Sequence, residues 1–154
     1  MLSYPMREER VSLQDLPTLY ESFESGGTRS GGFHSSRSWS GVRTVTLSTP
    51  LGVRYTVDWM ELGQDGEWHY RRSPFSGTAM VGGGAVAVDN VRVYPDGAEV
   101  QSWTWWENGE LRSMTDGKGR TESYVYDGLA RLVSVTDEEG NTTKAYEYQY
   151  SNNE

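Results

Sequence analysis

Short runs in which hydrophobic and polar residues alternate recur along the chain. The longest is Val53–Trp59, and similar runs of β-branched and aromatic residues follow at Val86–Val88, Val91–Val93, Trp103–Trp105 and Tyr124–Tyr126. A period of two is typical of strands that bury one face. No long stretch keeps the helical spacing i, i+3, i+4, i+7 without a glycine or proline. The pattern therefore predicts an all-β fold of antiparallel strands.

Asp-Gly or Asn-Gly pairs separate many of these runs. There are five, at Asp65-Gly66, Asp96-Gly97, Asn108-Gly109, Asp116-Gly117 and Asp127-Gly128. These residue types tolerate the positive φ that tight hairpin turns require. We therefore expect neighbouring strands to be joined as hairpins.

The runs divide the chain into three zones. Residues 1–19 are polar and charged and are expected to form a leader or linker. Residues 20–95 carry strand signals at intervals of roughly 8–12 residues, which favours a β-sandwich. Residues 96–154 contain a repeat, because a shift of 21 residues gives seven identities in 20 positions between 102–121 and 123–142. Each unit has the pattern of an aromatic strand, a turn, an aliphatic strand and an Asp-x-x-Gly turn.

The second unit, residues 124–141, reads YVYDGLARLVSVTDEEGN. It resembles the YD, or Rhs-type, repeat of large bacterial surface and secreted proteins. The chain departs from that family at Ala130, where glycine is usual, and at Trp106, which stands where the second unit has Asp127. Gly128 is then expected to supply the positive φ. The resemblance implies stacked β-hairpins, which in full-length relatives form a shell around a toxin or a surface stalk.

The middle zone resembles the start and end of a galactose-binding-like jelly roll, a frame shared by carbohydrate-binding modules. The similar stretches are 20–26, 34–38 and 86–95. In that fold one carboxylate on the first strand and one on the last often ligate a structural calcium, which implies Glu24 and Asp89 here. The alternative is a solvated Glu24 and an Asp89 that only caps a strand end.

A jelly-roll-like zone that is followed directly by YD-type hairpins resembles the C-terminal end of large cell-surface proteins of gut Bacteroides-type bacteria. It implies an extracellular or cell-surface module with a structural or adhesive role and no catalysis, although the first residues show no signal peptide. One alternative is a carbohydrate-binding module. A second is a fragment of an Rhs-type toxin-delivery shell. The aromatic strand expected at 146–150 is a candidate edge for self-association.

Four aromatic residues are candidates for stacking on a polysaccharide or a host or cell-surface glycan: Trp39, Trp68, Tyr70 and Trp106. An aromatic ring can pack on the apolar face of a sugar while polar neighbours hold its hydroxyls. Core packing is the competing interpretation for each of them. Trp105 and Trp106 are adjacent, so we expect them on opposite faces of a strand. This makes Trp106 the sharper candidate.

Composition narrows the possible functions. With 14 Lys and Arg against 22 Asp and Glu, the net charge of −8 opposes binding to nucleic acid. The chain has no cysteine, so disulfides and thiol chemistry are ruled out. The longest uncharged stretch, 73–88, is too short and too rich in glycine for a membrane helix. Familiar hydrolase and zinc motifs do not occur, and no enzyme is expected.

Overall fold

The computed structural model describes residues 8–11 and 16–148, which form 14 strands and no helix. All strand pairs are antiparallel. The predicted all-β fold, a sandwich followed by hairpins, is confirmed. No helix among the described residues is long and apolar enough to cross a membrane.

The main sheet of the sandwich is built around one buried strand. Its order is β3-β4-β9-β6-β7, and β2 also pairs with β9. All nine residues of β9 are buried. β6 pairs with one edge of β9, and β2 and β4 share the other. The strands are β2 (Leu19–Glu21), β3 (Arg29–Gly32), β4 (Ser35–Ser40), β6 (Tyr55–Leu62), β7 (Trp68–Phe75) and β9 (Ala87–Pro95).

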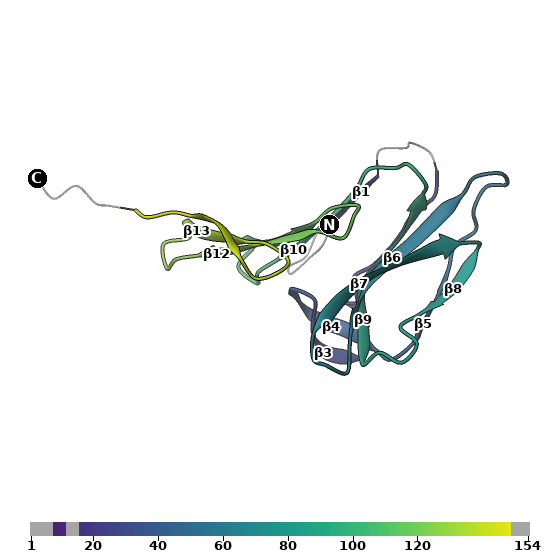
Figure 1. Cartoon of the computed structure of the whole chain (residues 1–154), viewed down its shortest axis with the longest axis horizontal. Coiled ribbons are helices and arrows are strands. Elements are labelled where there is room, and N and C mark those ends of the chain that lie inside the picture. The colour runs from purple at the N-terminus through teal and green to yellow at the C-terminus, as the bar shows by residue number, and fades with distance from the viewer. Residues whose placement is uncertain (1–7, 12–15, 149–154) are drawn as a thin grey trace, which may run out of the picture.

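A two-stranded sheet, β5 (Arg43–Thr46) and β8 (Thr78–Val81), forms the smaller layer of the sandwich (Figure 1). Alternate residues of the main sheet supply the core, because Val57, Val91 and Val93 point to the same side. The buried core cluster is Phe23, Val45, Tyr55, Val57, Phe75, Val81, Val88, Val91 and Val93. Trp59 is partly buried and packs against this cluster.

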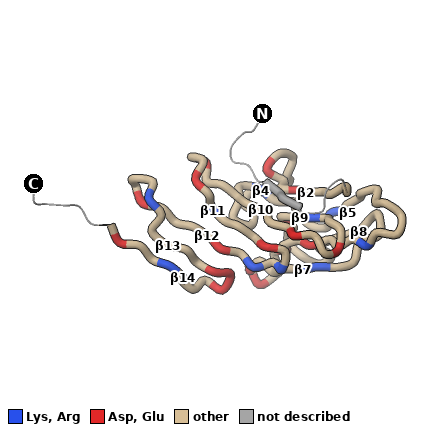
Figure 2. Tube along the Cα trace, turned by 90° about the horizontal axis from the view of Figure 1, so that it is seen from above, with Lys and Arg blue, Asp and Glu red and all other residues tan. Residues whose placement is uncertain are grey.

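The second sheet is a meander that leads away from the sandwich (Figures 1 and 2). Its order is β1-β10-β11-β12-β13-β14. Burial decreases along it, from alternate buried residues in β10 to four exposed residues in β14. We call it the hairpin sheet; its strands are β1 (Glu8–Val11), β10 (Val100–Trp105), β11 (Leu111–Thr115), β12 (Thr121–Tyr126), β13 (Leu132–Thr136) and β14 (Thr142–Ala145).

Both ends of the hairpin sheet differ in detail from the sequence expectation. Residues 8–11, inside the stretch expected to be a leader, pair with β10. Among the described residues the last strand is β14. Tyr146 N–H donates to the Val133 carbonyl, but residues 146–148 of the strand expected at 146–150 are not in a strand. Residues 149 and 150 lie outside the described residues.

Candidate functional site

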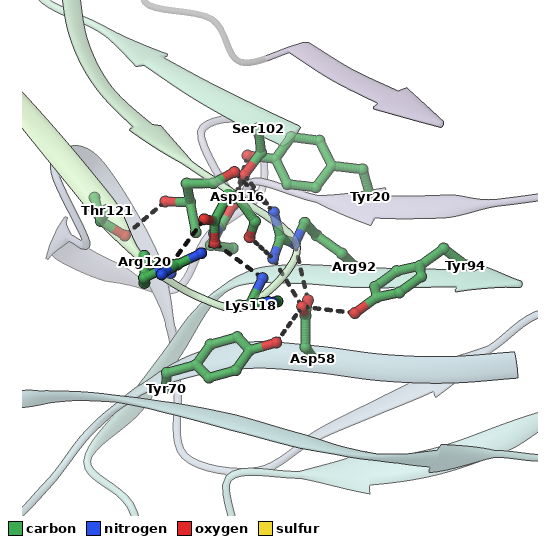
Figure 3. A network of polar contacts seen from close by, with 12 residues as sticks. Tyr20, Asp58, Tyr70, Arg92, Tyr94, Ser102, Asp116, Lys118, Arg120 and Thr121 are labelled. Atoms are coloured by element: carbon green, nitrogen blue, oxygen red, sulfur yellow. Dashed lines mark hydrogen bonds and ion pairs between the residues drawn. The ribbon is translucent and has the colours of Figure 1, made fainter. Parts of the chain in front are cut away.

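A buried ion pair lies where the sandwich meets the hairpin sheet (Figure 3). Asp58 on β6 and Arg92 on β9 are direct partners in the strand register, so their side chains leave the sheet on the same face. Both side chains are 0% exposed. Arg92 Nε donates to Asp58 Oδ1 at 2.8 Å and Nη2 donates to Oδ2 at 2.7 Å. Such paired, charge-assisted bonds are the strong and directional ones.

The same guanidinium also holds the hairpin sheet. Arg92 Nη1 donates to Ser102 Oγ at 3.3 Å and to the Thr115 carbonyl at 3.1 Å, and Nη2 donates to the Asp116 carbonyl at 2.8 Å. One side chain of the sandwich therefore bonds to β10, to β11 and to the turn that follows β11. We call this set of contacts the junction.

Tyrosine hydroxyls complete the shell around Asp58. Tyr70 and Tyr94 both donate to Asp58 Oδ2, at 2.7 and 3.0 Å. Burial, followed by the negative charge of Asp58, raises the pKa of Tyr94 to about 12 and that of Tyr70 still further. Both hydroxyls therefore stay protonated as hydrogen-bond donors at neutral pH.

A second branch of the junction runs through Asn90. Tyr20 of β2 and Ser102 of β10 both donate to Asn90 Oδ1, at 2.8 and 3.1 Å. Asn90 has a φ of 53° and lies beside the bulge between Asp58 and Met60. Asparagine is one of the few residues with a side chain that adopts this conformation readily.

The turn that follows β11 packs directly on the sandwich. Gly119 has a φ of 81°, and a Cβ built on it would lie 2.3 Å from Cγ of the Tyr70 ring. The backbone of the turn therefore lies against the ring, and only glycine fits there.

The aspartates of the repeat close the hairpin turns. Asp127 Oδ1 accepts hydrogen bonds from the backbone N–H groups of Leu129 and Arg131, at 2.8 and 3.0 Å. Asp116 and Asp137 make the same two bonds in their own turns. This arrangement explains why an aspartate recurs in the sequence. The expectation for Gly128 is wrong, because Ala130 adopts the positive φ, at 64°.

Acid is expected to weaken these turns. The backbone N–H of Arg131 is the largest of the contacts that hold the pKa of Asp127 below its usual value. A carboxylate of this kind adds stability above its unfolded pKa of about 3.9, and the gain is lost as the pH falls through the folded value. As the pH is lowered from about 5 to about 3, we expect the urea concentration at the unfolding midpoint to decrease. Asp127→Asn should reduce this pH dependence, and an unchanged dependence would contradict the role of Asp127.

Replacing Ala130 by glycine is expected to stabilise the chain by roughly 0.5–1 kcal/mol, because the left-handed conformation strains a side chain with a Cβ. Ala145, an exposed strand residue without positive φ, supplies the control. Ala145→Gly should instead lower the free energy of unfolding, because glycine weakens a strand. Urea denaturation measures the stability change of both variants. A lower stability of Ala130→Gly would contradict the prediction that Ala130 is strained.

The structure places three of the four aromatic candidates within the sandwich. The Trp39 ring lies 4.4 Å from the Arg43 guanidinium, and its Nε1 donates to the Val42 carbonyl. Trp68 meets Phe33 edge to face at 6.0 Å. Tyr70 belongs to the junction, with Gly119 against its ring. A sugar-stacking role for these three stays a prediction.

Trp106 lies apart from them, in the turn that follows β10. It is 36% exposed, and its Nε1 donates to the Tyr124 carbonyl at 3.3 Å. Trp105 and Trp106 were expected on opposite faces of a strand, but both line one groove. The reason is that β10 ends at Trp105 and has an irregular register between Thr104 and Trp105.

The two expected calcium ligands have other partners. Asp89 is fully buried, and its carboxylate accepts hydrogen bonds from Phe33 N–H, the Ser35 hydroxyl and Asn90 N–H at 2.7–2.8 Å. Glu24 accepts hydrogen bonds from the backbone of residues 36 and 37. Calcium prefers six to eight oxygen ligands. Among the described residues, no group of three or more Asp, Glu, His or Cys is placed to hold a metal ion.

Because N–H and O–H donors already occupy both carboxylates, we expect a chelator to leave the melting temperature unchanged. A ligand that binds only the folded state must stabilise it, so a lower melting temperature in chelator would instead indicate bound calcium. Glu24→Gln distinguishes the site, because a calcium ligand there would make the variant insensitive to the chelator.

The junction was not predicted from the sequence. The available signal was one charge of each sign, Asp58 and Arg92, in the middle of two apolar strand runs. Alternation alone places such residues on the solvent side of a sheet. Only the docked hairpin sheet turns that side into an interior.

Comparison with known proteins identifies the hairpin region. Residues 105–142 match the family described as RHS Repeat. The match runs from the end of β10 to the start of β14, so it covers the repeated hairpins and confirms the predicted YD-type repeat. No curated protein and no solved structure matches the chain.

Proposed function

We propose that this chain is a non-catalytic structural module of an extracellular or cell-surface protein, in which the sandwich is a rigid base for a row of RHS-type hairpins. Proteins of the RHS family are typically extracellular or associated with the cell surface. The observation that carries the proposal is Arg92, which bonds to the sandwich and to the first hairpin together. A buried guanidinium with this many partners favours one relative arrangement of the two sheets.

The far end of the hairpin sheet supports an extended role. All four residues of β14 are exposed, and β14 pairs with β13 on one side. An edge strand offers unpaired N–H and C=O groups to a further strand. A row of hairpins that continues past β14 would serve a surface stalk, in line with a structural or adhesive role in a Bacteroides-type surface protein. It would also serve an Rhs-type toxin-delivery shell, the second candidate.

Lengthening the row by one period tests this proposal. A second copy of residues 121–141, inserted after Asn141, should form two further strands and place them in register. Hydrogen exchange should then show protection in the inserted copy equal to that of β12 and β13, without a lower melting temperature. An insert with the same residues in scrambled order is the control, and it should remain unprotected.

If the inserted copy exchanges as fast as the scrambled insert, the proposal that the sandwich is a base for stacked hairpins is contradicted. A hydrolase or transferase activity that disappears on replacement of one carboxylate would contradict the non-catalytic part. The two results are separable, because the first concerns strand pairing and the second a reaction.

A further inference from the structure

A groove of about 670 Å³ lies at the first hairpin turn, which connects β10 and β11. Three aromatic rings line it, those of Trp105, Trp106 and Tyr126. Trp106 is 36% exposed, and Val125, which also lines the groove, is 46% exposed. Ser36 of β4 completes the other side. The groove is therefore an open aromatic surface that is formed by both the sandwich and the hairpin sheet.

The groove lies where this chain departs from its own repeat. The later turns place a carboxylate at the position of Trp106 and close with it. The first turn is closed by Asn108 instead, because its Oδ1 accepts from Glu110 N–H at 3.1 Å and its Nδ2 donates to the Glu110 carboxylate at 2.9 Å. The indole of Trp106 is therefore not needed to close the turn. An exposed aromatic patch of this kind is typical of a surface that binds a partner.

Carboxylates outnumber guanidinium groups at the groove. Glu107 and Glu110 belong to the lining, and Arg112 is the one basic residue among the lining residues that the structure describes. Glu24 adds a third carboxylate at the rim, because it accepts a hydrogen bond from Ser36 N–H at 3.3 Å. The excess of negative charge favours a ligand that carries a Lys or Arg side chain and disfavours an anion.

Trp105 adds a hydrogen-bond donor to the lining. Its Nε1 is buried and has no acceptor among the described residues. The indole N–H can only donate, and a buried donor without an acceptor calls for an explanation. A carbonyl oxygen of a ligand in the groove would supply the missing acceptor. The ligand should therefore combine an apolar face with accessible carbonyl groups.

A proline-rich segment in the polyproline II conformation has all of these properties. Its backbone forms no internal hydrogen bonds, so its carbonyl oxygens are available as acceptors. Proline has no N–H, so a proline ring that packs against an aromatic ring leaves no donor unsatisfied. Its conformation is fixed before binding, which reduces the entropy that is lost on association. Aromatic-lined grooves are a recurring way to recognise such segments.

We propose that this groove binds a proline-rich segment of a partner protein in the polyproline II conformation. Proline rings pack on Trp106 and Tyr126. The Trp105 indole turns toward the segment and donates to one of its carbonyls. A Lys or Arg beside the prolines pairs with the carboxylates of Glu107 and Glu110. The proposal does not rest on the structural role of the hairpin row. A short peptide in a shallow groove corresponds to a dissociation constant on the order of 0.1 mM.

The repeat itself supplies the variant that tests the groove. Trp106→Asp combined with Glu110→Arg restores the aspartate and arginine that the second unit has at Asp127 and Arg131. It removes the indole and one carboxylate while it keeps a turn that this chain already folds. Tyr146→Ala is the matched control, because Tyr146 is an exposed aromatic residue outside the groove lining.

Trp105→Phe tests the hydrogen bond separately. It keeps an aromatic ring in the lining and removes the Nε1 donor, which has no acceptor among the described residues of the free chain. The variant should therefore lose no hydrogen bond of the fold, but it should bind the segment at least about threefold more weakly, the effect of one neutral hydrogen bond. Undiminished binding would contradict the bond from Trp105 to a carbonyl of the segment.

Calorimetry with two blocked peptides of about ten residues provides the measurement. The first consists of prolines with an arginine at each end, and the second keeps the arginines but replaces the prolines by glycine and serine. The first should bind the unchanged chain, with at least a tenfold loss (about 1.4 kcal/mol) in the double variant and no loss in Tyr146→Ala. The melting temperatures show that each variant is folded.

Three results would overturn the proposal. The first is equal binding of the two peptides, which would show an attraction of charge alone. The second is binding of the proline peptide that survives the double variant. The third is no binding of the proline peptide to the unchanged chain at about 5 mM.

Discussion

Asp58→Asn is expected to lower the free energy of unfolding by roughly 3–5 kcal/mol, the cost of breaking a buried ion pair by removing one charge. The asparagine keeps the size of the side chain but leaves the Arg92 guanidinium without its counter-charge in an interior where both side chains are 0% exposed. The hydroxyls of Tyr70 and Tyr94 also lose their charged acceptor. Urea denaturation at neutral pH, monitored by tryptophan fluorescence, measures this loss in the free energy of unfolding.

A surface pair provides the control for this prediction. Glu21 and Arg43 form an ion pair at 3.1 Å in which both side chains are about one-third exposed. Glu21→Gln should cost less than about 1 kcal/mol, because water screens such pairs. Similar losses in Glu21→Gln and Asp58→Asn would show that the junction does not hold the two sheets together.

The strands and turns were predictable because they depend on local patterns. The alternating run at Val53–Trp59 became β6, and the shift of 21 residues located the repeat that the RHS family match confirms. One local detail was wrong. The turn at Asp127 is closed by the hydrogen bond from Ala130 N–H to the Asp127 carbonyl, so the positive φ falls on Ala130, two residues after Gly128.

The junction was not predictable from one sequence. Asp58 and Arg92 are 34 residues apart and leave the sheet opposite to Val57 and Val93, on the face that alternation assigns to solvent. They are buried because the hairpin sheet packs on that face. The groove at Trp106 was only partly predictable, because the departure from the repeat is visible in the sequence but the neighbourhood of Tyr126 and Ser36 is not.

Gly119→Ala is expected to destabilise the chain by roughly 2–4 kcal/mol. About 1 kcal/mol arises from a side chain in the left-handed conformation, and a further 1–3 kcal/mol from overpacking against the ring of Tyr70. Gly140 has nearly the same φ, 86°, but no atom within 4 Å of its built Cβ. Gly140→Ala therefore carries the backbone cost alone, and the difference between the two variants measures the docking of the hairpin turn on the sandwich.

A double-mutant cycle with Tyr70→Ala shows whether the ring is the cause. Removing the ring gives the new methyl group of Gly119→Ala room, so in that background its cost should fall to about that of Gly140→Ala, near 1 kcal/mol. Urea denaturation of the four chains supplies the coupling energy. The loss of stability caused by Gly119→Ala could stay the same with and without the ring, or it could equal that of Gly140→Ala in both backgrounds. Either result would mean that the turn does not pack on Tyr70. The hairpins would then be held to the sandwich by the chain and by the hydrogen bonds of Arg92 and Asn90, without packing of the turn on Tyr70.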